Sequence, residues 1–142
     1  MNADFVKFPD QPQIMREKII ESIAENNFHE AAMYAERLFN IEHTFETNFL
    51  CANLLFEVSE FEKAYQVSKV FEENYLQNLD YRGFYVEVLI RSSNVLRAQQ
   101  IIEETLREDL PSEILEQWKE YKWQYQNVAK GMSISPNPNI SI

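Results

Sequence analysis

The sequence predicts an all-α protein, a superhelix of three helical hairpins followed by a C-terminal capping helix. Only 2 glycines occur in 142 residues, too few for the positive-φ turns and bulges that sheet proteins usually need. Three short segments share one pattern, and their alanines, Ala31, Ala64 and Ala98, lie 33 and then 34 residues apart. Between these segments, apolar residues recur at spacings of three and four, as they do in amphipathic helices.

Each repeated segment indicates the second helix of a hairpin. The segments are Asn27–Ala31, Glu60–Ala64 and Asn94–Ala98. A polar residue starts the helix, an apolar residue staples the turn, and the alanine is small enough for two helices to pack closely. We therefore expect repeat packing at Ala31, Ala64 and Ala98. The expected helices are 13–26, 29–40, 44–58, 61–75, 80–92 and 95–108, grouped into units 13–43, 44–78 and 79–110.

A further helix is expected over 112–131, after the start signal Pro111-Ser112 and before the stop signal Gly131. An apolar stripe along it predicts that it caps the third unit, because terminal repeats need a polar outer face. Trp123 lies off this stripe and is either a solvent-facing contact residue or a packing residue. The repeat domain thus spans 13–131, between an N-terminal extension (1–12) and a tail (132–142) whose composition predicts disorder.

Composition excludes several classes of partner. A net charge of -10 disfavours nucleic acid and anionic lipid, which both require basic surfaces. The acidity is interpreted as a solubility feature, with an acidic patch for a basic partner as the alternative. The N-terminus lacks the basic start and apolar run of a signal peptide, and no apolar stretch approaches the ~20 residues of a membrane span. We expect a protein of the nucleus or cytoplasm that binds neither nucleic acid nor membrane.

No motif predicts an enzyme. Gly83 and Gly131 stand alone, so no glycine-rich phosphate loop is present. His29 and His43 have no cysteine nearby, and one cysteine permits neither a disulfide nor a multi-cysteine zinc site. Cys51 lies among apolar neighbours, as an inert packed thiol does. We therefore expect no catalytic, cofactor-binding or metal-binding residues, and no cofactor.

The unit length and the apolar-x-x-alanine segments resemble the tetratricopeptide repeat over residues 13–110. The repeats are degenerate, since the positions of the family's tryptophan hold Met15, Asn48 and Arg82. In this family the first helix of each unit lines a concave groove. By that register, the resemblance places in the groove or in a dimer interface Arg16, Glu17, Ile20, Ile23, Phe49, Leu50, Asn53, Phe56, Phe84, Glu87 and Ile90.

The groove implied by this register is apolar. The positions at which family members hold a C-terminal carboxylate with basic and amide side chains carry Ile20, Leu50, Asp80 and Phe84 beside a lone Arg16. An exposed apolar groove is typical of a partner site and suits an amphipathic helix. The occupant is a second copy, another protein, or the chain's own N-terminal segment, which offers Phe5, Val6 and Phe8.

A narrower resemblance rests on the segments Ala35-Glu36-Arg37-Leu38-Phe39 and Lys63-Ala64-Tyr65, together with His43 and Phe49-Leu50. These segments are similar to the N-terminal repeats of the scaffold subunits of the anaphase-promoting complex. The resemblance implies a non-catalytic module that homodimerises within a ubiquitin ligase of the cell cycle and contacts other subunits. The alternative is a tetratricopeptide adaptor or chaperone that binds an amphipathic helix or peptide in the same groove.

Overall fold

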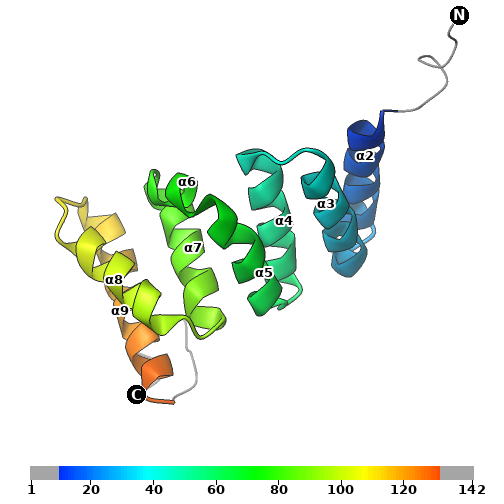
Figure 1. The fold of residues 1–142 in the computed structure, drawn as a ribbon. Helices are drawn as coiled ribbons and strands as arrows, with labels where there is room; N and C mark the ends of the chain where they lie inside the picture. The colour runs from blue at the N-terminus through cyan, green and yellow to red at the C-terminus, as the bar shows by residue number, and fades with distance from the viewer. Residues whose placement is uncertain (1–9, 132–142) are drawn as a thin grey trace, which may run out of the picture. The chain divides into compact units, whose positions relative to one another are not determined.

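The structure, a computed structural model, describes residues 10–131. All regular elements in this range are helical, which confirms the prediction of an all-α helical-repeat fold. The elements are α2 (Gln11–Ala24), α3 (Phe28–Ile41), α4 (Phe45–Glu57), α5 (Phe61–Ser68), the 3-10 helix η1 (Lys69–Phe71), α6 (Glu72–Leu76), α7 (Leu79–Arg91), α8 (Val95–Leu106) and α9 (Ser112–Ala129) (Figure 1).

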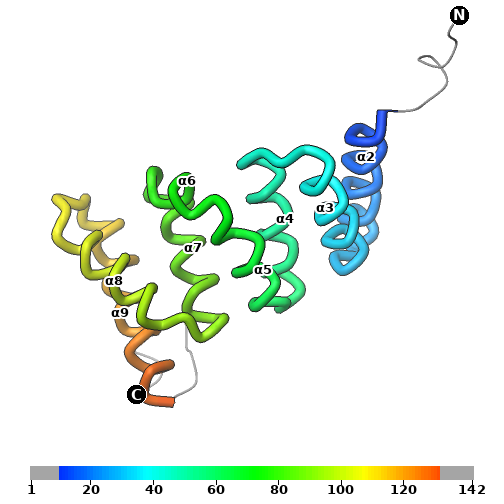
Figure 2. Tube along the Cα trace, viewed as in Figure 1, coloured from blue at the N-terminus to red at the C-terminus, as the bar shows by residue number. Residues whose placement is uncertain are grey.

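The chain divides into two compact units between Phe71 and Glu72. Unit 1 holds α2 to η1, and unit 2 holds α6 to α9. Within each unit, every helix packs against the next one along the chain, and the trace in Figure 2 reverses direction at each hairpin turn. The division falls inside the expected second repeat, 44–78.

The three hairpin turns share one backbone geometry. At each turn one residue has a positive φ: 58° at Asn26, 64° at Ser59 and 66° at Ser93. The next residue donates its N–H to a carbonyl five positions back, at 2.7–2.9 Å, in the pairs Asn27–Ser22, Glu60–Leu55 and Asn94–Leu89. This is the Schellman arrangement that ends a helix. The turns therefore repeat at the same spacing as the alanines, although no glycine occupies them.

Side chains cap some of the helices but not all those expected. Asn27 accepts a hydrogen bond from the Glu30 amide at 3.2 Å, and Thr44 and Thr47 form a reciprocal capping box at the start of α4. Glu60 and Asn94 are the N-cap residues of α5 and α8, as expected of polar helix-starting residues, but their side chains make no capping hydrogen bond. The side-chain amide of Asn94 instead donates to the Ser92 hydroxyl at 2.8 Å, so this side chain stabilises the turn rather than the helix.

The prediction of one continuous helix over 61–75 is wrong. The α-helix ends at Ser68, three residues of 3-10 helix follow, and α6 begins at Glu72. At the change, the side-chain amide of buried Asn48 donates to the Val67 carbonyl at 2.9 Å. A side chain that enters the hydrogen-bond ladder is a common cause of a helix break. This partner lies on α4, so the pattern of 61–75 alone does not reveal it.

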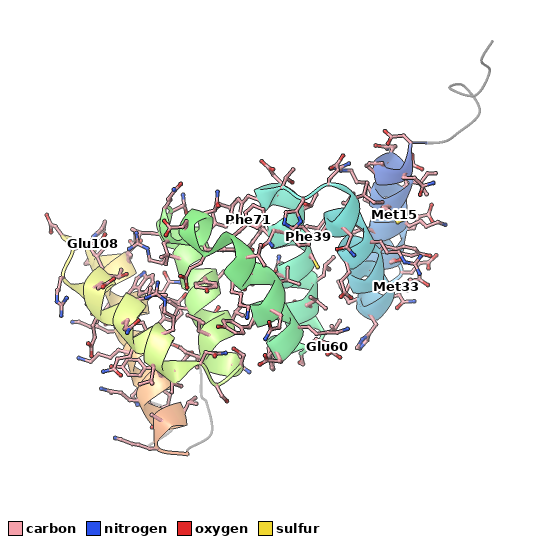
Figure 3. All side chains as sticks on the ribbon, viewed as in Figure 1. Met15, Met33, Phe39, Glu60, Phe71 and Glu108 are labelled. Carbon is pink, nitrogen blue, oxygen red and sulfur yellow. The ribbon has the colours of Figure 1, made fainter. Side chains whose placement is uncertain are left out.

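Unit 1 has a core of small and aliphatic side chains. Fully buried alanines lie along α3, α4 and α5, and branched side chains fill the space around them; the set includes Ala31, Ala35, Ala52, Ala64, Leu38 and Leu55. Ala31 and Ala64 have no exposed surface, as close helix packing requires. At one end of this core the rings of Phe39 and Phe71 meet edge to face, with centroids 6.0 Å apart (Figure 3).

Unit 2 has an aromatic core. Its buried rings come from α6, α7 and α9: Tyr75, Tyr85, Trp118, Tyr121 and Tyr125. Ala98 is the fully buried alanine of this unit's repeated segment. Gly83 allows α9 to approach α7, because a Cβ atom at this position would lie 2.9 Å from the Tyr121 hydroxyl. The expected cap over 112–131 is helical from Ser112 to Ala129 and packs on both α7 and α8.

Candidate interaction surface

The outward sides of α2 and α4 carry most of the groove residues expected in unit 1. On α2, the side chain of Ile20 is 67% exposed and that of Ile23 is 38% exposed. On α4, Leu50 is half-buried and Asn53 is exposed. Ile20 and Asn53 are separated by 33 residues, as Ala31 and Ala64 are, so they hold equivalent positions in the first helices of their hairpins. We name this region the α2/α4 surface and define it by Glu17, Ile20, Glu21, Ile23, Glu46, Leu50, Asn53 and Glu57.

Three other expected groove residues of unit 1 have partners in the structure. Arg16 forms an ion pair with Glu42, which follows α3. This ion pair raises the pKa of Arg16 through the hydrogen bond to Glu42. Phe49 and Phe56 are half-buried, and Phe56 packs edge to face on Phe61 with ring centroids 5.1 Å apart. These three residues therefore stabilise unit 1 more than they add surface for a partner.

The remaining expected groove residues, Phe84, Glu87 and Ile90, belong to unit 2. Ile90 is 1% exposed, so it is a core residue and offers no surface to a partner. Phe84 is half-buried and stacks on Tyr75 at a centroid distance of 6.1 Å. Burial raises the pKa of Glu87, Arg91 lowers it, and Glu120 raises it further, with a net increase.

The α2/α4 surface also carries exposed acidic groups. Its four carboxylates, Glu17, Glu21, Glu46 and Glu57, are all exposed. The two basic residues of α2 are engaged elsewhere: Arg16 pairs with Glu42, and the Lys18 ammonium lies 5.7 Å from the Tyr34 ring centroid. α4 contains no basic residue. The surface therefore combines exposed isoleucines with a negative rim.

The outer side of α9 is a feature that the sequence prediction missed. Lys119, Lys122, Gln126 and Lys130 are exposed at helical spacing, opposite the buried stripe of Trp118, Tyr121 and Tyr125. Trp123 lies among them and is half-buried, so it contributes to packing and still presents part of its ring. The available signal was the absence of any Asp or Glu after Glu120. We name this region the α9 surface and define it by Lys119, Lys122, Trp123, Gln126 and Lys130.

Cys51 lies on the floor of an open hollow of about 180 Å³ between α3 and α5. Burial raises the pKa of its thiol to about 12, and the charge of Glu36 adds to the increase. A thiol with such a pKa is protonated at neutral pH and is a poor nucleophile. Among residues 10–131, no three histidine, cysteine or carboxylate side chains gather where they could hold a metal ion.

In the part of the chain that the structure describes, every helix is too short or too polar to cross a bilayer. Comparisons with family models, with curated proteins and with solved structures gave no match. The functional interpretation therefore depends on the two surfaces and on the resemblance carried by the repeated segments.

Proposed function

We propose that this chain is a non-catalytic scaffold that binds protein through the α2/α4 surface of unit 1, and that its partner there is a second copy of itself. The resemblance of the repeats makes this a homodimerising module of an anaphase-promoting-complex subunit, acting in the nucleus or cytoplasm beside other subunits. The observation that supports binding is the exposure of Ile20 and Ile23 on α2. Exposed apolar patches with a polar rim are typical of protein interfaces.

The oligomeric state in solution tests this proposal. We expect light scattering to give a dimer mass for the wild-type chain at micromolar concentration. Ile20→Asp should raise the dissociation constant about tenfold or more, because burying one isoleucine contributes ~1.5–3 kcal/mol and an unpaired carboxylate at the interface adds a cost. Circular dichroism should show unchanged helix content, since Ile20 is 67% exposed in the chain.

Leu96→Asp is the matched control. Leu96 is 75% exposed on α8, so the substitution places the same charge at another exposed apolar position, outside the α2/α4 surface. This variant should remain a dimer. A wild-type chain that is monomeric throughout the micromolar range would contradict the homodimer.

The second candidate function is an adaptor that binds an amphipathic helix from another protein. The negative rim of the α2/α4 surface favours this reading, because a basic helix would find complementary charge there. A monomeric wild-type chain whose melting temperature rises on addition of a basic amphipathic peptide would support the adaptor over the homodimer.

A further inference from the structure

We propose that the α2/α4 surface of one copy receives the α9 surface of a second copy. The inference depends on the proposed homodimer, because it names the part of the partner that fills the site. Charge complementarity is the main argument. The α2/α4 surface carries four exposed carboxylates, and the α9 surface carries three exposed lysines, Lys119, Lys122 and Lys130. Of these, Lys119 also forms an exposed ion pair with Glu116 of the same helix, at 3.5 Å.

Few other surfaces of the chain could approach this acidic rim. The protein carries 23 acidic and 13 basic residues, so contact between two arbitrary faces brings like charges together, which opposes association. The second half of α9 reverses this balance. From Lys119 to Gly131 the chain has three lysines and one carboxylate, Glu120, which is half-buried. The α9 surface is therefore a basic region within an acidic protein.

The two surfaces also match in their apolar parts. Trp123 presents part of its indole ring among the lysines, and Ile20 and Ile23 are exposed among the carboxylates. Tryptophan is enriched among the residues that contribute most to interface affinity. The aliphatic stems of Lys119 and Lys122 can cover apolar area while their ammonium groups reach the rim. In the proposed contact, Ile20 and Ile23 are therefore buried where the lysines of one copy meet the carboxylates of the other.

The contact joins two different surfaces, so one such contact alone could add further copies in a ring or filament. The homodimer proposed above corresponds to the closed form, in which a two-fold axis relates two equivalent contacts and both surfaces of each copy are used. Species larger than a dimer would contradict this closed form.

Charge reversal on each surface tests the pairing. One variant is Lys119→Glu with Lys122→Glu, and the other is Glu21→Lys with Glu57→Lys. Each alone should weaken the dimer about tenfold or more, because like charges would then face each other across the interface. A mixture of the two variants should form a heterodimer, since both contacts regain opposite charges. The four substitutions combined in one chain should likewise restore the dimer. Sedimentation velocity measures all these states.

Matched controls carry the same charge changes elsewhere. Arg37→Glu with Lys63→Glu and Glu73→Lys with Glu104→Lys replace exposed residues outside both surfaces, and both control variants should dimerise like the wild type. Far-ultraviolet circular dichroism should confirm that every variant is folded. A dimer that withstands both reversals at the α9 and α2/α4 surfaces would overturn this pairing while leaving the homodimer intact. A monomeric wild-type chain would overturn the homodimer itself.

Discussion

The two units solve the same packing problem with different side chains. Unit 1 brings its helices together over alanines such as Ala31, Ala35 and Ala64, whereas unit 2 fills its interior with rings such as Tyr85 and Trp118. The first and the last helices that the structure describes, α2 and α9, also differ. α2 buries little of its length and leaves Ile20 exposed, while α9 buries a complete aromatic stripe and exposes lysines.

The comparison concerns how much of each helix is buried by its own unit. A helix with a wide buried stripe is fixed by its own unit, as α9 is. α2 buries Met15, Ile19 and Ser22 and leaves Ile20 and Ile23 exposed. Among the described residues, α9 is therefore the more deeply packed of these two helices, and α2 leaves more apolar surface exposed.

The largest expected effect concerns the aromatic core. Trp118→Ala should lower the free energy of unfolding by about 3–5 kcal/mol, because it removes a fully buried ring from unit 2. Urea denaturation followed by circular dichroism measures the change. Trp123→Ala on the same helix is the matched control and should cost clearly less, since Trp123 is half-buried. Equal losses would show that α9 is not divided into a packed side and an exposed side.

An intermediate loss of stability is expected when a buried alanine of unit 1 is enlarged. Ala31→Leu should destabilise the chain by about 1–3 kcal/mol, because a residue with no exposed surface has no room for three more carbon atoms. Thermal unfolding measures the loss. Ala24→Leu adds the same atoms at an exposed position of α2 and should be nearly neutral. If the two substitutions had the same effect, unit 1 would not depend on small residues for its packing.

The smallest effects should come from two carboxylates of unit 2 whose pKa values shift in opposite directions. Burial alone would raise the pKa of Glu72, but hydrogen bonds from Arg97 and Tyr85 outweigh it, and the net pKa is lowered. Its ionised form therefore stabilises the fold above the unfolded-state pKa, and this contribution is lost as the pH falls through the lowered value. Burial gives Glu87 a raised pKa, so its contribution is present at acidic pH and is lost as the pH rises through the folded-state value.

Substitution by glutamine distinguishes the contributions of Glu72 and Glu87 to stability. At pH 7, Glu72→Gln should lower the melting temperature and Glu87→Gln should raise it. The difference between Glu87→Gln and the wild type should disappear as the pH falls below ~4, where glutamate is protonated in the unfolded chain. Melting curves between pH 3 and pH 8 measure both trends, with Glu73→Gln, an exposed neighbour, as the control. Two variants that change in the same direction would contradict the assigned contacts.

Most of the helical architecture follows from patterns within single segments. The apolar period and the recurrence of Ala31, Ala64 and Ala98 predict the helices to within a few residues, because core-facing residues must repeat with the turns of the helix. The break after Ser68 is different. It coincides with a hydrogen bond from Asn48, 19 residues earlier in the chain, and neither glycine nor proline marks it.

The candidate surface was predictable only in part. The alignment with the tetratricopeptide repeat selects one side of the first helix of each hairpin as the groove, and Ile20 on that side of α2 is exposed. The same register selects Ile90, which the surrounding side chains of unit 2 bury. Burial depends on how many neighbours cover a helix, and this information lies in other segments. The lysines of α9 were missed because a register based on the first helix of each hairpin does not consider a terminal helix.

The positive-φ turns at Asn26, Ser59 and Ser93 also bear on how such a chain can grow. Each turn joins its two helices through the same backbone hydrogen bonds, whatever the side chains are. A DNA segment duplicated from one turn to the next would encode two helices, the second of one hairpin and the first of the next, and the new junction between the copies would fall within a turn of the same geometry. Lengthening or shortening of the gene by two such helices would therefore require no newly evolved connection.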